Sequence, residues 1–450
     1  MDLANIEKPK YTSKLPSLEC NGHYRQLGAS LVSHMHVSLS RRRRRTLPAT
    51  LALGCVLISV VMVNARLRSP LPTLRVSSHT PATIVARGSL PRLPWPAQGE
   101  AAVAIPSIST AAVASTLKQR AVPIASLAKL MTAYLVLKHL PLVIGSQGPV
   151  ITISAADEQQ YYNDVAQDQS SVQVTAGEHL TEYQLLQALL TRSANNVAQL
   201  LATWVAGSEA AFVSQMNQTA TRIGLTDTHF ADASGFSSAT KATAKAIATI
   251  AAIDMRNPVF DRIVNEHTVT LPLVGTLPNI VARIGTANVV GIKSGYTIWS
   301  GGCAAIATQE PTKVGKIEAV AVVLDQQGPA SLHHAASIAE RLANEASLGV
   351  IRATVARSHQ SIGSLKVPWA TSTQPASNLI LSHALTANLW PGQKVTYKLH
   401  LIAASALIGT APGTVAGYLQ VQWPLHNERI SVVTTERIQA PSDWWRLVHA

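Results

Sequence analysis

The sequence predicts an α+β fold, in which strands and helices occupy separate stretches of the chain. Short apolar runs typical of strands stand on both sides of a segment, 181–253, where apolar residues recur at helical spacing. Another helical pattern follows the last of these strands, and from residue 347 the chain changes to short alternating runs separated by turns. This order favours an antiparallel sheet flanked by helices, with a helical subdomain, followed by a small all-β domain.

Composition limits the kind of protein before any motif is considered. A chain of 450 residues, 47% of them apolar, has room for two or three domains with large cores. Its net charge of +13 favours a polyanionic neighbourhood such as a membrane surface or a cell wall. We predict no nucleic-acid binding, because no aromatic–basic repeat or zinc spacing accompanies the charge. Cys20, Cys55 and Cys303 form no Cys-x-x-Cys pair, so neither a zinc knuckle nor a redox pair is suggested. We expect no metal and no other cofactor.

The N-terminal segments predict a membrane attachment followed by a linker. Residues 1–46 carry nine Lys and Arg against three Asp and Glu, with five consecutive arginines at 41–45, and are expected to be cytoplasmic. Residues 47–65 contain no charge and are just long enough to span a bilayer, as a transmembrane anchor or as a cleaved signal segment. The arginines place the rest of the chain outside the membrane, or secreted if the segment is cleaved. Residues 66–97 contain six prolines and predict a semi-rigid, extended linker.

Residues 98–346 are predicted to form one α+β domain. Pro123 can open a helix, because the missing N–H of proline costs nothing in a first helical turn. Thr181-Glu-Tyr-Gln184 is a capping-box pattern at the start of the helical insert, and Gly207 suits a C-cap. The expected strands are 101–105, 111–115, 150–153, 172–174, 267–271, 289–297, 302–308 and 316–324. The expected helices are those that begin at Pro123 and at Thr181, one ending at Gly207, and 209–223, 239–253 and 331–346.

Residues 347–450 are predicted to form the small β domain. Alternating runs at 364–369, 394–401, 417–423 and 430–435 are separated by turn signals, and helical periodicity is absent. The tail, 441–450, contains two adjacent tryptophans. It is interpreted either as a short amphipathic membrane contact or as a strand or turn that packs its tryptophans on the β domain.

Ser126 and Lys129 are the first candidate catalytic pair. They stand three residues apart at the N-terminus of an apolar helical pattern, so they share one face. A serine hydroxyl is a poor nucleophile until a base removes its proton. No Asp or Glu occurs from residue 101 to 156, so Lys129 is the natural local base. The spacing alone is weak evidence, because Ser-x-x-Lys also begins at Ser115 and at Ser238.

Two further motifs make the pair more specific. Ser193-Ala-Asn195 is the only Ser-x-Asn in the chain and lies at a break between two predicted helices. Lys293-Ser-Gly295 is the only Lys-[Ser/Thr]-Gly and lies on a predicted core strand. The three motifs follow one another at intervals of 67 and 100 residues. The set, in this order and in these contexts, is far more specific than any one motif.

The three motifs resemble the signatures of penicillin-binding proteins and serine β-lactamases. Their surroundings at 125–132 and 291–297, together with Gly224-Leu-Thr-Asp-Thr-His-Phe230, are similar to low-molecular-mass penicillin-binding proteins, the serine-type D-alanyl-D-alanine carboxypeptidases. The similarity covers roughly residues 98–346. It implies a β-lactamase/transpeptidase-like catalytic domain, peptidoglycan stem peptides as substrate and β-lactam antibiotics as inhibitors. A small β domain after the catalytic domain is usual in that family.

The resemblance implies that Ser126, Lys129 and Ser193 are catalytic. Ser126 would form an acyl-enzyme, and Lys129 would be its base. A free lysine titrates near pH ~10.4, so burial and the proximity of Lys293 would have to lower the pKa of Lys129. Ser193 would pass protons between the base and the leaving amine.

The resemblance also implies a substrate-binding set. Asn195 would hold the substrate amide and the lysine amine. Lys293 and Ser294 would receive the terminal carboxylate of the substrate, next to Gly295. The backbone N–H groups of Ser126 and Tyr296 would stabilise the oxyanion.

The sequence departs from the family pattern at three places, which leaves substrate preference open. Lys-Ser-Gly replaces the commoner Lys-Thr-Gly, with the hydroxyl retained, and Tyr296 stands where many relatives have His. The stretch 328–334 lacks the arginine that many relatives carry, and has His333 and His334 instead.

Two other functions remain as alternatives. A β-lactamase of class A would need a Glu-x-x-Leu-Asn type loop between the second and third motifs, and none occurs. A non-catalytic cell-wall-binding scaffold is the other alternative, although all the motif residues are present.

Overall fold

The computed structural model describes residues 47–286, 288–370 and 376–449. The described residues fall into two units: 47–69 with 446–449, and those of 70–445. The predicted cytoplasmic segment, 1–46, lies outside the described residues.

The smaller unit is built on α1, Leu47–Arg68. Its 22 residues extend for about 33 Å at 1.5 Å per residue. Within the described residues it is the one helix long and apolar enough to cross a membrane, and a signal sequence would have the same character. Arg66 donates to the backbone oxygen of Leu447 (2.8 Å), and Arg446 donates to that of Leu67 (2.6 Å). The last residues of the chain are thereby tied to the end of α1.

A five-stranded antiparallel sheet organises the larger unit, in the order β11-β12-β13-β3-β4. The predicted strand 289–297 coincides with β11, and the predicted strands 302–308 and 316–324 are confirmed as longer strands that pair as a hairpin. Because β11 is the edge strand, its outer side is free of a neighbouring strand. The strands are β3 Glu100–Ile105, β4 Ser109–Ser115, β11 Val289–Thr297, β12 Gly301–Thr312 and β13 Gly315–Gln326.

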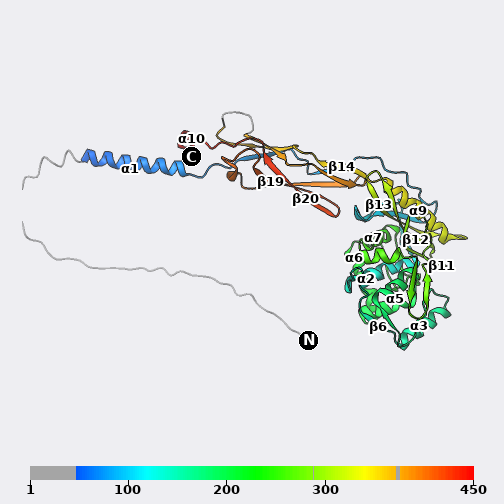
Figure 1. Cartoon of the computed structure of the whole chain (residues 1–450). Helices are drawn as coiled ribbons and strands as arrows, with labels where there is room; N and C mark the ends of the chain where they lie inside the picture. Colours follow the sequence, from blue (N-terminus) through cyan, green and yellow to red (C-terminus); the bar gives the residue numbers. More distant parts are fainter. Residues whose placement is uncertain (1–46, 287, 371–375, 450) are drawn as a thin grey trace, which may run out of the picture. The chain divides into compact units, whose positions relative to one another are not determined.

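Helices cover both faces of this sheet (Figure 1). Successive side chains of a strand point to opposite faces, and alternate residues of β13 accordingly enter two different cores. One core packs against α9, Ser331–Leu348, and the other contains α2 and α7. Burial on both faces explains why these strands are nearly continuous apolar runs.

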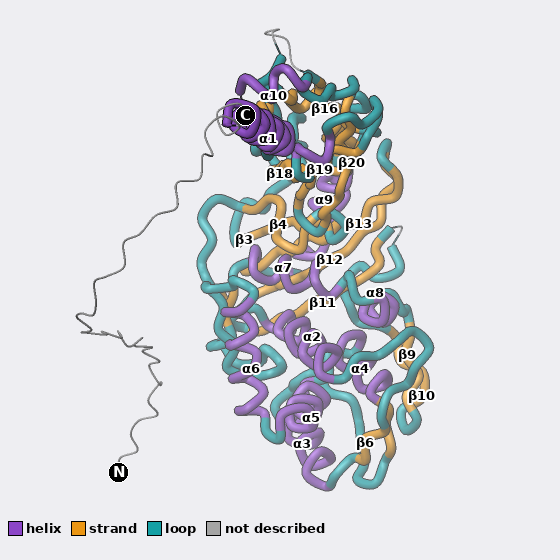
Figure 2. Tube along the Cα trace, turned by 90° about the vertical axis from the view of Figure 1, so that its left-hand side faces the viewer, coloured by secondary structure: helices purple, strands orange, loops and turns teal. Residues whose placement is uncertain are grey.

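The helical part follows the predicted pattern from Thr181 onward. The Thr181–Gln184 capping box forms at the start of α4, and Gly207 ends α5 with a φ of 79°. Figure 2 shows α3 and α5 close together, with α6 beside them. The helices are α2 Lys129–His139, α3 Ala155–Ala166, α4 Glu182–Thr191, α5 Asn195–Ala206, α6 Glu209–Arg222, α7 Ala244–Asp254 and α8 Pro258–Val264.

Three short strand pairs connect these helices. They are β5 Val122–Pro123 with β8 Lys241–Ala242, β6 Val150–Thr152 with β7 His179–Thr181, and β9 Thr268–Leu271 with β10 Gly275–Pro278.

The C-terminal part is a seven-stranded antiparallel sheet beside a two-stranded one. The larger sheet has the order β1-β15-β16-β20-β19-β18-β2, and β14 pairs with β17. Inward-facing residues of these strands share an apolar core of their own. The strands are β1 Arg75–Ser78, β2 Thr83–Val85, β14 Ile351–Ala356, β15 Ser361–Lys366, β16 Ser377–Leu381, β17 Leu385–Leu389, β18 Lys394–Leu401, β19 Val415–Trp423 and β20 His426–Thr434.

The Pro-rich segment is not the extended linker that its composition predicts. Its strands β1 and β2 pair with β15 and β18, at the two edges of the C-terminal sheet. Each is three or four residues long and stands between prolines, which is compatible with an edge position. The predicted boundaries 66–97, 98–346 and 347–450 remain predictions.

Two other expectations about secondary structure are wrong, and the tail, for which two interpretations were open, forms a helix. The polar stretch after β6 forms α3, capped by Ser154 and Asp157, and residues 172–174 form no strand. Pro123 lies in β5, and the helix it was expected to open begins with a 3₁₀ turn at Ala125. The tail forms a helix, α10, Asp443–His449, in which Trp445 meets Trp369 edge-on at 5.9 Å.

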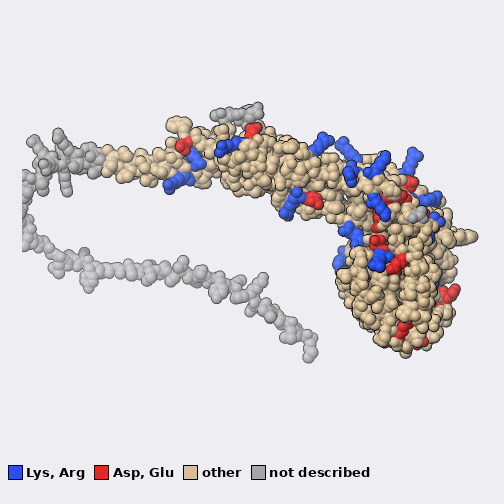
Figure 3. All heavy atoms as spheres, viewed as in Figure 1, with Lys and Arg blue, Asp and Glu red and all other residues tan. Residues whose placement is uncertain are grey.

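Charged side chains on the visible face do not form one continuous basic surface. In Figure 3, Lys and Arg lie singly or in small groups, with Asp and Glu among them.

Candidate active site

The candidate nucleophile Ser126 lies on a tight turn that precedes α2. Ala125–Ala128 forms the 3₁₀ turn, and Ala125 has a φ of 47°. This left-handed conformation is unfavourable for a residue with a Cβ, and such strain is concentrated at functional sites. The turn continues directly into α2 at Lys129, so Ser126 and Lys129 meet as the spacing predicts. Lys129 Nζ lies 3.1 Å from Ser126 Oγ.

Lys129 is held by three partners deep in the protein. Its side chain is 0% exposed. Besides Ser126, its Nζ donates to Asn195 Oδ1 (2.6 Å) and to the backbone oxygen of Ser234 (2.8 Å). The amine is therefore fixed in front of the hydroxyl that it would deprotonate.

The second motif meets the first at the break between α4 and α5. Ser193 has a φ of 60°, and its hydroxyl donates to Ser126 Oγ at 2.9 Å. Asn195 begins α5, and its Nδ2 donates to Gln169 Oε1 (2.6 Å) while its Oδ1 faces Lys129. Ser126 Oγ thus lies between an amine and a second hydroxyl.

The third motif brings the edge strand against the nucleophile. A Cβ on Gly295 would stand 2.7 Å from Ser126 N, so only glycine permits β11 to approach this closely. Lys293 is 1% exposed, and its Nζ donates to the backbone oxygen of Ser294 (2.9 Å). Tyr296 follows on the same strand with its side chain 57% exposed, which leaves its backbone as the part beside the site.

Burial changes the acid–base behaviour of both lysines. It lowers the pKa of Lys129 to about 7, against the opposing charges of Asp232 and Asp164. Burial, and then the charge of Lys129, lower the pKa of Lys293 well below its usual value. A pKa near 7 gives Lys129 a large neutral fraction at neutral pH.

Three contributors to the site were not predicted from the sequence. The Ser234 carbonyl holds Lys129, the Gln169 amide holds Asn195, and the Ala282 N–H donates to Ser294 Oγ (3.1 Å). Two of them act through the backbone, which no residue type reveals, and the third is a glutamine in a polar stretch. All three lie in loops or turns, after α3, α6 and β10, which the fold brings to the motifs.

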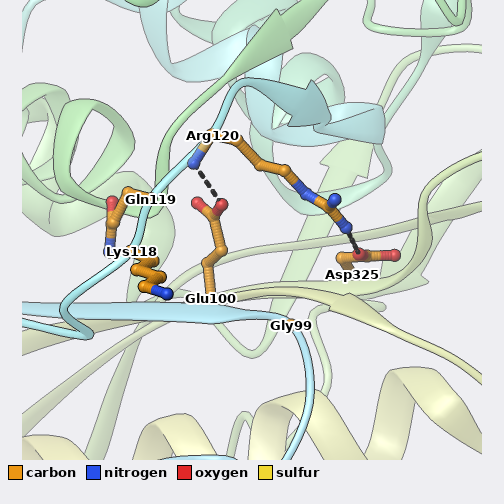
Figure 4. Close-up of a pocket in the computed structure, with 6 residues that line it drawn as sticks. All are labelled: Gly99, Glu100, Lys118, Gln119, Arg120 and Asp325. Carbon is orange, nitrogen blue, oxygen red and sulfur yellow. Dashed lines mark hydrogen bonds and ion pairs between the residues drawn. The ribbon is translucent and has the colours of Figure 1, made fainter.

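A separate pocket of about 330 Å³ lies at the start of β3 and contains none of the motif residues (Figure 4). The backbone N–H of Arg120 donates to the carboxylate of Glu100. The guanidinium of Arg120 lies 3.9 Å from the carboxylate of Asp325. These contacts join the chain before β5 to the ends of β3 and β13. The pocket is lined by Gly99, Glu100, Lys118, Gln119, Arg120 and Asp325.

The sequence matches a known family over most of the region that holds the site. The model of the peptidase S11 family, described as D-alanyl-D-alanine carboxypeptidase, matches residues 93–328, more than half of the chain. A D-alanyl-D-alanine carboxypeptidase of Streptomyces sp. (strain K15) is 31% identical over 181 residues, which are 38% of this chain and 60% of that protein. For DacB2 of Mycobacterium tuberculosis the identity is 30% over 184 residues, 39% of this chain and 58% of the relative. The chain thus spans less than two thirds of these relatives.

Solved structures share the fold at low sequence identity. A peptidoglycan synthesis regulatory factor (PBP3) from Streptococcus pneumoniae superposes with a TM-score of 0.53 at 20% identity, over 76% of this chain and 99% of that one. Penicillin binding protein 5 from Haemophilus influenzae gives 0.52 at 17% identity, over 77% and 99%. These likenesses confirm the predicted α+β fold with a further β part.

Proposed function

Because this chain belongs to the peptidase S11 family of D-alanyl-D-alanine carboxypeptidases, we propose that it removes the terminal D-alanine from peptidoglycan stem peptides. One observation carries the proposal: the Ser126 hydroxyl lies 3.1 Å from a buried amine and 2.9 Å from a second hydroxyl. A nucleophile within reach of its base, with the base oriented by further groups, is the general arrangement for covalent catalysis.

Acylation begins when neutral Lys129 takes the proton of Ser126 Oγ. The oxygen attacks the carbonyl carbon of the penultimate residue, and the negative charge on the carbonyl oxygen is stabilised by the N–H groups of Ser126 and Tyr296. Collapse breaks the peptide bond, and Ser193 passes a proton from Lys129 to the leaving D-alanine amine. The result is an ester on Ser126, with Lys129 again neutral. Water then attacks the ester, with Lys129 as base, and releases the shortened peptide.

The terminal carboxylate of the substrate binds at Lys293 and Ser294. The Ala282 N–H donates to Ser294 Oγ, which leaves the hydroxyl proton free to point at an incoming carboxylate. A carboxylate beside Lys293 would favour the protonated lysine and so offset the effect of burial on its pKa. This pairing selects substrates with a free terminal carboxylate.

β-Lactam antibiotics acylate the same serine. Their strained amide carbonyl takes the place of the peptide carbonyl, and their carboxylate takes the place of the terminal one. The leaving amine stays attached to the acyl group, because both belong to the opened ring. The ester on Ser126 therefore persists if water attacks it slowly. Inhibition by penicillin therefore follows from the same geometry.

The catalytic part acts outside the cytoplasm, attached through α1. This helix is long enough for a bilayer, and the arginine run that precedes it favours a cytoplasmic N-terminus. Attachment would keep the enzyme near newly made wall material.

The test is intact-mass spectrometry of the full chain, purified in detergent and incubated with penicillin. We expect one drug adduct per chain on a peptide containing Ser126, and release of D-alanine from an N-acylated peptide ending in D-Ala-D-Ala. Ser126→Ala is expected to lower both rates by at least about 10⁴-fold. Ser115→Ala, in another Ser-x-x-Lys, is the matched control and should react at the wild-type rate.

Two outcomes would contradict the proposal. Rapid drug hydrolysis without an accumulated adduct would indicate a β-lactamase. Neither an adduct nor released D-alanine would leave a non-catalytic wall-binding role.

A further inference from the structure

A short turn after α6, residues 232–237, is built around the carboxylate of Asp232. One carboxylate oxygen accepts from Ser234 Oγ (2.6 Å) and from the N–H of Phe236 (2.8 Å). The other accepts from Thr240 Oγ1. Thr240 is fully buried and also accepts the N–H of Ala231 at 2.9 Å. The carboxylate thus fixes the turn from both ends.

This turn is packed directly on the catalytic elements. A Cβ on Gly235 would stand 1.8 Å from the backbone oxygen of Ala125, so the turn touches the backbone beside Ser126. Thr132 on α2 donates to the backbone oxygen of Ala233 (2.7 Å). The next carbonyl along the turn, that of Ser234, accepts from Lys129 Nζ at 2.8 Å. A displacement of the turn would therefore displace an acceptor of the base.

The charge of Asp232 acts on the same amine. Three charged groups influence Lys129 or are influenced by it: Asp232 in the turn, Asp164 on α3 and Lys293 on β11. The two carboxylates favour its protonated form, whereas burial disfavours it. Asp232 is the larger of the two favourable influences. Geometry and charge thus act on one atom, Lys129 Nζ.

We propose that Asp232 is a positioning residue for the base: its carboxylate fixes the turn whose Ser234 carbonyl holds Lys129 Nζ. The inference rests on the proposed function, since it assigns Lys129 the role of base. Asp232 touches neither Ser126 nor the proposed carboxylate subsite in the described contacts, so it acts through Lys129.

The experiment is the pH dependence of the second-order rate of penicillin acylation, from pH 5 to 10, in the full chain. Asp232→Asn keeps the shape and removes the charge. Because Asp232 favours protonated Lys129, its removal should move the acid limb of the profile to lower pH. The plateau rate should fall about tenfold, because the base becomes weaker and less well held. Asp227→Asn, the same change at an exposed position a few residues earlier, is the control and should leave the profile in place.

Thr240→Val separates geometry from charge. It removes one hydrogen bond to the carboxylate and keeps the charge, so acylation should slow several-fold with the acid limb unmoved. It also provides the test if Asp232→Asn does not fold. An acid limb unmoved in Asp232→Asn, or a wild-type rate in Thr240→Val, would overturn the inference. A wild-type chain that forms no adduct would instead contradict the proposed function itself.

Discussion

The surroundings of Ser126 and the C-terminal sheet differ in the kinds of side chain that they bury. Around Ser126, two lysines are buried and two residues with a Cβ, Ala125 and Ser193, have left-handed backbone. In the C-terminal sheet, the described buried residues are apolar except for a few serines and threonines. Its core is formed by Leu, Ile, Val, Ala and Trp.

This difference affects stability, because the buried lysines near Ser126 lower it and the C-terminal sheet has no comparable group among its described buried residues. Removing a lysine ammonium from water is costly, and the cost is met by neutralising the amine, which is the form a base requires. The sheet contains no such group among its described buried residues, so its packing contributes to stability without the cost of burying a charged group. Changes at Lys129, the proposed base, should therefore alter acylation above all, and changes in the sheet should alter stability alone.

Lys129→Met should give the largest effect, a loss of acylation of at least about 10³-fold, because no other described group is in place to accept the Ser126 proton. The rate of adduct formation with penicillin measures it. Lys138→Met, at an exposed position of the same helix, is the control and should retain the wild-type rate. A loss below tenfold in Lys129→Met would show that another group is the base.

Lys129→Met, compared with the wild type, also tests how much the buried Lys129 amine lowers the free energy of unfolding. Lys129 titrates near pH 7 in the folded protein and near 10.5 in the unfolded chain, so the folded state binds fewer protons between these values. The cost is fully present below pH 7 and absent above pH 10.5. The free energy of unfolding should therefore rise with pH across this window in the wild type relative to Lys129→Met, by up to about 5 kcal/mol. Denaturant unfolding at pH 6.5 and 9.5 measures it, and a constant difference would contradict the lowered pKa.

Leu379→Ala tests the C-terminal sheet, where a substitution should lower stability and leave acylation unchanged. Leu379 is fully buried in the C-terminal core, and its truncation leaves a cavity that costs about 3 kcal/mol of stability. The acylation rate should stay at the wild-type value at temperatures where the protein is folded. Val415→Ala, at an exposed position of β19, is the control and should change stability by less than about 0.5 kcal/mol. A parallel loss of acylation would show that the predicted boundary at residue 347 does not separate two independent parts.

The sequence predicted the residues of the site more completely than the secondary structure around it. The motifs predicted the meeting of Ser126, Lys129 and Ser193, because three motifs in this order and in these contexts are far more specific than any one of them. The Ser234 carbonyl was missed, since every residue carries a carbonyl and only the folded chain selects one. Strand β1 was missed because it is four residues long and pairs with β15, almost 300 residues later. Helix α3 was missed because its polar composition lacks a strong apolar stripe.

Gly295→Ala should give the smallest of these effects and tests the contact between sheet and nucleophile. The added methyl would stand 2.7 Å from Ser126 N, so β11 must move away from the 3₁₀ turn. The proposed oxyanion donors, Ser126 N–H and Tyr296 N–H, then separate, and acylation should fall about 30-fold, or about 2 kcal/mol in the barrier. Gly315→Ala, in the β12–β13 turn with nothing within 4 Å, is the control. Since Gly315 has a φ of 113°, its substitution should lower stability while leaving acylation unchanged. Equal acylation rates in the two variants would mean that β11 contributes no group to the transition state, and that the oxyanion is stabilised from the Ser126 turn alone.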